Sequence, residues 1–76
     1  MEKRSISIKG HRTSIAIEPA FWVVLEKAAD DAGCTMPMLV SEIDRKRTKQ
    51  SPVPGLASAL RVYALAFVDP ATSEEG

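Results

Sequence analysis

The stretch from Gly10 to Glu18, Gly10-His11-Arg12-Thr13-Ser14-Ile15-Ala16-Ile17-Glu18, decides how the chain begins to fold. Its isoleucines, at positions 15 and 17, alternate with small or polar residues, which is the period-two pattern of a half-buried strand. The preceding segment has the same pattern, but its isoleucines, Ile6 and Ile8, fall on even positions. One continuous strand would therefore put the two pairs of isoleucines on opposite faces.

Gly10 offers two ways to bring the isoleucines to one face. If Gly10-His11 is a two-residue type II′ turn, which prefers glycine first, the flanking segments pair as a hairpin with Lys9 opposite Arg12. A bulge at Gly10 within an extended ribbon would also reverse the parity. We favour the hairpin. Its polar face would carry Ser5, Ser7, Lys9, Arg12, Ser14 and Ala16.

Three helices are expected downstream. The first begins at Pro19, which suits the first helical position, and ends at Gly33, which suits a left-handed cap. The second follows Thr35 as its N-cap. The third covers residues 56–67 and ends before Pro70. Strand and helix patterns together predict a core made of Ile15, Ile17, Phe21, Trp22, Leu25, Ala29, Leu39, Val40 and Ile43.

The length of 76 residues allows one domain, which we place at residues 1–69, followed by a disordered tail at 70–76. A domain this small often needs disulfides, a metal or oligomerisation to be stable. Cys34 and His11 are the only cysteine and histidine, so neither a disulfide nor a closed zinc site is expected. Oligomerisation is the remaining means.

The sequence offers no catalytic constellation. A lone histidine in a turn and one cysteine do not make a nucleophile with its base, and the four glycines are too scattered for a phosphate loop. We therefore expect no enzyme activity and no cofactor. The chain also lacks an apolar run long enough to span a membrane and a signal-peptide pattern, which predicts a cytoplasmic protein.

Charge is unevenly distributed although the net charge is zero. Residues 1–17 hold four cations and one anion, a balance of 4 − 1 = +3, and residues 45–49 form a second basic cluster. A basic side on a neutral protein fits a partner that meets one side only. The cations of the first segment that we expect to contact phosphates, together with its histidine, are Lys3, Arg4, Lys9 and His11.

The order of strand, proline-initiated helix, Gly-Cys-Thr corner and second helix resembles the ribbon-helix-helix family. The resemblance runs from about Arg12 to about Lys46. Its most telling pieces are Thr13-Ser14-Ile15-Ala16-Ile17-Glu18, Leu25-Glu26-Lys27-Ala28-Ala29 and Gly33-Cys34-Thr35. The wider pieces Gly10-His11-Arg12-Thr13-Ser14-Ile15, Phe21-Trp22, Val40-Ser41-Glu42-Ile43-Asp44 and Ser58-Ala59-Leu60-Arg61-Val62 are similar to a bacterial subfamily of ribbon-helix-helix proteins and extend the match over most of the chain.

The resemblance implies an α+β, mainly α-helical fold that works as an intertwined homodimer, with strands of two chains paired into a ribbon and with the predicted core shared between the chains. The ribbon would enter the DNA major groove, which admits a two-stranded β element. The matching base-contacting positions are Arg12, Ser14 and Ala16. The backbone amides of Thr35 and Met36, at a helix N-terminus, would bind a phosphate.

Two functions follow as hypotheses. The first is a sequence-specific DNA-binding homodimer, a bacterial-type transcription regulator on a two-fold operator, assembled as a dimer or a tetramer. The second is a protein-interaction dimer that keeps the fold without strong DNA binding. An antitoxin that binds both DNA and a protein partner, the latter through the third helix, is a variant between the two. The four-stranded sheet that two hairpins would form, the zero net charge and the apolar pair Val23-Val24 motivate this alternative.

Overall fold

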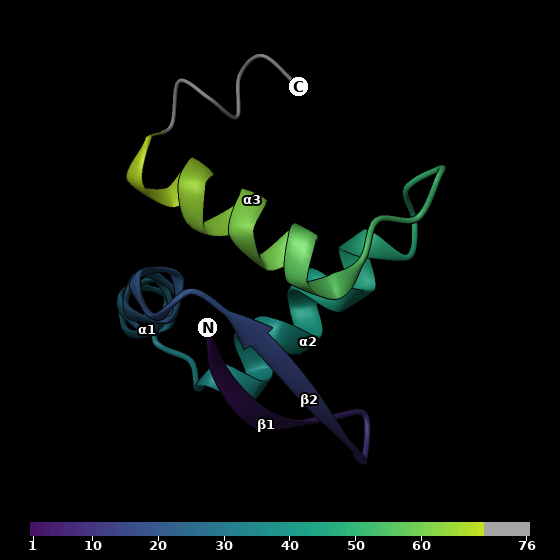
Figure 1. Ribbon diagram of the computed structural model, residues 1–76, viewed down its shortest axis with the longest axis horizontal. Helices are drawn as coiled ribbons and strands as arrows, with labels where there is room; N and C mark the ends of the chain where they lie inside the picture. The colour runs from purple at the N-terminus through teal and green to yellow at the C-terminus, as the bar shows by residue number, and fades with distance from the viewer. Residues whose placement is uncertain (70–76) are drawn as a thin grey trace.

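The elements follow one another as a hairpin and then three helices in the computed structural model, which describes residues 1–69. They are β1 (Glu2–Ile8), β2 (His11–Ile17), α1 (Pro19–Ala32), α2 (Met36–Arg47) and α3 (Leu56–Val68). The hairpin and α3 lie at opposite sides of the molecule, with α2 between them (Figure 1). This arrangement confirms the predicted hairpin and the mainly helical class. The expected tail, from Pro70 onward, lies outside the described residues.

The hairpin turn is Lys9-Gly10, so the predicted Gly10-His11 turn is wrong by one residue. Ile8 pairs with His11, and regular antiparallel pairing continues to Glu2 opposite Ile17, without a bulge at Gly10. Both turn residues have positive φ, 52° at Lys9 and 80° at Gly10, as a type I′ turn requires. This turn matches the twist of the flanking strands, and glycine takes the second position instead of the first.

The error in the turn leaves the prediction of the two faces intact. Moving the turn by one residue shifts the pairing by two, and side chains alternate with a period of two. All four isoleucines therefore still share one face, and all four are buried, namely Ile6, Ile8, Ile15 and Ile17. The opposite face stays exposed to solvent.

The helix boundaries follow from the capping residues, as predicted. Pro19 occupies the first turn of α1, and Gly33 caps its end at φ 71°, in the left-handed region. The Thr35 hydroxyl accepts a hydrogen bond from the Met38 amide at 3.3 Å, which satisfies one of the free N–H groups at the start of α2. These caps fix where α1 ends and where α2 begins.

The core lies between the hairpin and the three helices and is covered within one chain. The residues predicted as a shared dimer core are buried, except Phe21, which is half-buried against the same cluster. Trp22 is fully buried, and its Nε1 donates to the Glu2 carbonyl at 2.8 Å. The helix α3 adds Leu60 and Ala64, which the sequence did not single out as core.

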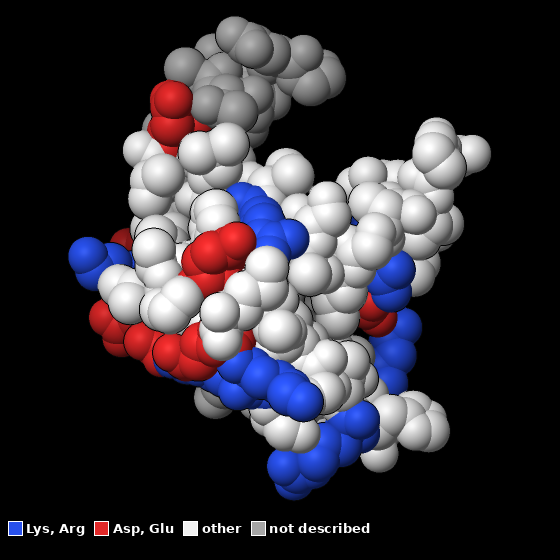
Figure 2. Space-filling view, in the orientation of Figure 1, with Lys and Arg blue, Asp and Glu red and all other residues white. Residues whose placement is uncertain are grey.

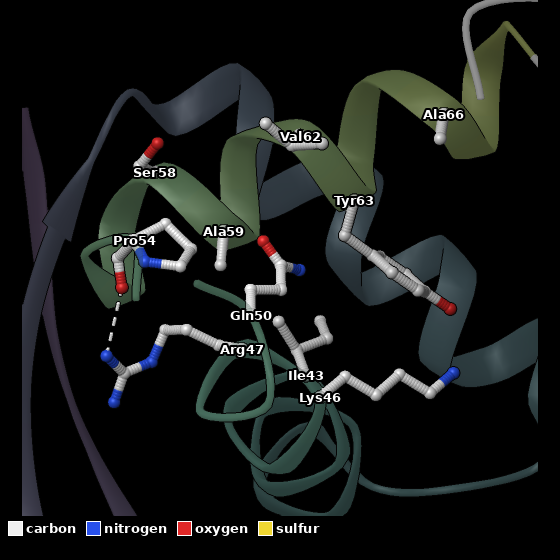
Figure 3. A pocket seen from close by; sticks show the side chains of 10 residues that line it. All are labelled: Ile43, Lys46, Arg47, Gln50, Pro54, Ser58, Ala59, Val62, Tyr63 and Ala66. Carbon is white, nitrogen blue, oxygen red and sulfur yellow. Dashed lines mark hydrogen bonds between the residues drawn. The ribbon is translucent and has the colours of Figure 1, made fainter. Parts of the chain in front are cut away.

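Two arginines tie α3 to the rest of the fold. Arg61 donates to the Glu18 carboxylate at 2.8 Å, which links α3 to the β2–α1 junction. Arg47 holds the buried Asp44 at 2.5 Å and donates to the Pro54 carbonyl at 3.0 Å, which anchors the loop before α3 (Figure 3). As a result, α3 is fixed against α1, α2 and β2.

Candidate nucleic-acid interface

The exposed face of the hairpin gathers side chains that can read base edges. Its cross-strand pairs, in order from the turn, are Ser7 with Arg12, Ser5 with Ser14, and Lys3 with Ala16. Every one of these side chains is exposed. The hairpin therefore brings the three predicted base-contacting residues, Arg12, Ser14 and Ala16, together on one surface, which we call the ribbon face.

The ribbon face is positively charged. Lys3 and Arg12 lie on it, and Lys9 lies in the adjoining turn. No ion pair or side-chain hydrogen bond holds any of these three cations within the described residues. Lys and Arg side chains gather at the hairpin side of the molecule, whereas acidic side chains gather around α1 (Figure 2). Unpaired cations with no carboxylate among them suit a phosphate-rich partner.

Arg4 is placed apart from this surface, on the core side of the hairpin. Its guanidinium donates to Glu2 at 2.5 Å and to Glu26 at 2.6 Å, and it stacks over the Trp22 ring at 4.8 Å from the centroid. The hydrogen bonds that Arg4 donates to Glu26 and, to a smaller extent, to Glu2 raise the Arg4 pKa above its ordinary value. Arg4 is thus half-buried and neutralised within the fold, unlike Lys3, Lys9 and Arg12.

The hairpin turn lies next to the N-terminal half of α2. Lys9 lines a shallow depression of about 390 Å³ together with α2 residues Pro37, Met38, Ser41, Glu42 and Arg45. Glu42 is already paired there, with Arg45 at 2.5 Å, and this hydrogen bond holds the Glu42 pKa below its ordinary value. Lys9 is therefore the free charge of the depression. His11 opposes Ile8 beside the turn and is exposed, but its register position belongs to the core side.

The start of α2 offers fewer amide donors than a helix N-terminus ordinarily does. Pro37 has no N–H, and the Met38 amide is bonded to the Thr35 hydroxyl. Of the predicted phosphate-binding pair, Thr35 is exposed and Met36 is half-buried. The amides of Thr35 and Met36 are therefore the donors that this end of α2 can present.

Comparison with known families decides how this geometry is to be understood. A family model described as the ribbon-helix-helix domain matches residues 1–68. The chain belongs to the ribbon-helix-helix family. Neither the comparison with curated proteins nor the comparison with solved structures found a match.

Ribbon-helix-helix domains are typically DNA-binding regulators that dimerise and are generally not enzymes. Residues 1–69 of this chain contain no helix long and apolar enough to cross a membrane. They also contain no group of three or more His, Cys, Asp or Glu residues that could hold a metal ion.

The sequence places Ser5 and Ser7 on the polar face of the hairpin but does not predict them as base contacts. Ser5 and Ser7 lie directly opposite Ser14 and Arg12, so they point from the same surface as the predicted base contacts. The predicted turn paired Ser7 with Ser14 and Ser5 with Ala16, so its displacement changed the partners of the two serines but not their face. The type I′ preference for glycine at the second turn position is the signal that could have predicted these cross-strand partners.

Proposed function

We propose that this ribbon-helix-helix protein is a sequence-specific, DNA-binding transcription regulator that acts as a homodimer and inserts its ribbon face into the major groove. The observation that carries the proposal is the ribbon face itself, which combines Arg12, Ser14 and Ala16 with unpaired cations and no carboxylate. A cytoplasmic location accords with such a regulator.

Each ribbon-face side chain has a base-reading chemistry. Arg12 can donate bidentately to guanine O6 and N7, and serine hydroxyls can donate or accept. Ala16 is small enough for close approach and can touch a thymine methyl group. Ser5 and Ser7, across the strand pair, extend the same hydroxyl-rich surface. Specific recognition then rests on Arg12, with the hydroxyls selecting among neighbouring bases.

Phosphate contacts would surround these base contacts. Lys3 and Lys9 stand at the two ends of the ribbon face, and His11 flanks the turn. The amides of Thr35 and Met36 would add donors beside the turn, where α2 begins. We expect Arg4 to make no phosphate contact, because Glu2 and Glu26 already hold its guanidinium.

Selection of genomic fragments by the purified protein, repeated over a range of salt concentrations, tests the proposal. We expect a short palindromic site whose affinity falls steeply as salt rises, because phosphate contacts release counterions. On that site, Arg12→Ala should cost about 1–3 kcal/mol of binding free energy and relax specificity at one position.

The matched control is Lys27→Ala, which removes an exposed cation that lies on α1 and not on the ribbon face. It should leave affinity and specificity close to those of the wild type. The absence of an enriched fragment, or equal losses for the two variants on every sequence, would contradict base reading by the ribbon face.

One observation favours a second candidate, a dimer that binds a protein partner as an antitoxin does. Val62, Leu65 and Val68 on α3 are exposed, as is Val23 on α1, whereas Val24 is half-buried. Under this alternative, Val62→Asp would abolish capture of one recurrent partner while Arg12→Ala would not. The reverse pattern on DNA would favour the regulator.

A further inference from the structure

A groove between α2 and α3 is separate from the ribbon face, since no ribbon-face residue lines it. Its volume is about 290 Å³, and its apolar walls are Ile43 of α2 on one side and Ala59, Val62 and Ala66 of α3 on the other (Figure 3). Pockets for small molecules begin at about 300 Å³ and are mostly apolar with a few polar groups. The groove is therefore of the size that a small ligand fills.

The two walls of the groove are joined by Arg47. Its guanidinium donates to the Asp44 carboxylate, with Nε at 3.0 Å and Nη2 at 2.5 Å, and Nη1 donates to the Pro54 carbonyl at 3.0 Å. These bonds tie the end of α2 to the loop that leads into α3, so the groove is formed without a ligand. Asp44 also neutralises Arg47, although Arg47 lines the groove.

Lys46 is the cation of the groove that no carboxylate neutralises. Its side chain is exposed and makes no ion pair or hydrogen bond within residues 1–69. Glu42, four residues earlier, is paired with Arg45 at 2.5 Å, and Lys46 lowers the Glu42 pKa less than Arg45 does. The residues that line the groove include no Asp or Glu. The groove therefore has one positive charge available to an anion.

Tyr63 supplies a second polar group beside Lys46. Its ring packs against the core cluster, and its hydroxyl makes no hydrogen bond within the described part of the chain. Figure 3 shows the Tyr63 hydroxyl and the Lys46 ammonium extending toward the same end of the groove. An ammonium and a hydroxyl can both donate to one carboxylate, and hydrogen bonds to a charged acceptor are the stronger kind.

We propose that this groove binds a small amphipathic carboxylate, that is, a monoanion with a short aliphatic or aromatic body. Lys46 and Tyr63 hold the carboxylate, and the body lies against Ile43, Ala59 and Val62. One available positive charge suits a single carboxylate better than a dianion such as phosphate, and the apolar walls suit its hydrocarbon part. The site goes beyond the proposed function, because it shares no residue with the ribbon face.

Titration of the isotope-labelled protein with straight-chain carboxylates from butanoate to octanoate, without DNA, tests the site. We expect saturable changes in the amide resonances of the groove residues. Affinity should rise about twofold to fourfold for each added methylene until the groove is full. Octanamide has the same chain but no charge, so it should bind about fivefold more weakly than octanoate.

Variants of two neighbouring lysines separate the site from general charge attraction. Lys46→Gln should weaken octanoate binding by about the same fivefold and leave octanamide binding unchanged. The matched control is Lys49→Gln, which removes an exposed cation three residues further on that does not line the groove, and it should bind octanoate as the wild type does. Far-UV circular dichroism establishes that both variants are folded.

Three results would overturn the proposal. One is the absence of saturable binding for every carboxylate of the series. Another is equal affinity for octanoate and octanamide, and the third is equal weakening of octanoate binding by the two lysine variants. Because no DNA is present in these titrations, their outcome is independent of the DNA selection that tests the proposed function.

Discussion

Arg4 and Lys9 are both cations of the hairpin, but their surroundings give them different roles. Arg4 is held by Glu2 and Glu26 and stacks on Trp22, whereas Lys9 stands free in the turn. The sequence places both in one basic segment, since charge counting does not see which face a strand residue occupies. The alternation of side chains along β1 puts Arg4 on the face of the buried isoleucines, and the turn leaves Lys9 free.

We predict that Arg4→Gln lowers the free energy of unfolding by about 1 kcal/mol, through loss of a partly exposed ion pair and a cation–π contact. It should leave the salt dependence of DNA affinity unchanged. Lys9→Gln should do the opposite, with little effect on unfolding and a decrease of about 1 in the slope of log affinity against log salt. Urea titration and DNA titration at several salt concentrations measure the two effects. A reduced salt slope for Arg4→Gln would show that Arg4 also contacts a DNA phosphate.

At the scale of elements, the hairpin turn has the least favourable backbone conformation among residues 1–69. Lys9 is the one non-glycine residue among residues 1–69 with positive φ, and Gly10 follows at φ 80°. Nothing lies within 4 Å of a Cβ built at Gly10, so space does not require the glycine there. Its positive φ does, because L-residues pay to enter that region.

Gly10→Ala should therefore lower the free energy of unfolding by about 1–2 kcal/mol, although the added methyl group touches nothing. Gly55→Ala provides the control, since Gly55 also has open space but an ordinary φ of −66°. It should change stability by a few tenths of a kcal/mol at most. Equal denaturation midpoints for both variants and the wild type would show that the turn carries no such cost.

The elements also show what the sequence could and could not predict. Caps are local, so Pro19, Gly33 and Thr35 could be assigned from neighbouring residues alone. Face assignment survived the misplaced turn because it depends on parity and not on register. Contacts made at a distance, such as Arg61 with Glu18 across 43 residues, leave no periodic signal in the sequence. The ribbon face was predicted residue by residue, but its separation from Arg4 was not.

At the scale of the whole molecule, one chain closes around its core because β1 and α3 cover two of its sides. Ile6 and Ile8 of β1 and Leu60 and Ala64 of α3 complete the cluster around Trp22. Family resemblance implied that a second chain would supply this cover. The added strand and helix give the single chain its own cover.

The attachment of α3 through Arg61 makes the whole fold sensitive to acid. The Arg61 hydrogen bond holds the Glu18 pKa below its ordinary value of 4.5. A carboxyl group with a lower pKa in the folded state contributes stability that is complete above the ordinary value and is lost as pH falls through the folded value. The free energy of unfolding should thus be flat above about pH 5 and decrease below it.

Glu18→Gln should be less stable than the wild type at neutral pH and should lose less stability on acidification, because it has no proton to take up at this site. Urea denaturation followed by circular dichroism, from neutral pH to about pH 3, measures both effects. Asp30→Asn removes an exposed carboxylate of α1 that makes no ion pair within residues 1–69, so its acid response should follow that of the wild type. If Glu18→Gln instead loses stability as steeply as the wild type, the Arg61 pair does not link α3 to the rest of the fold in solution.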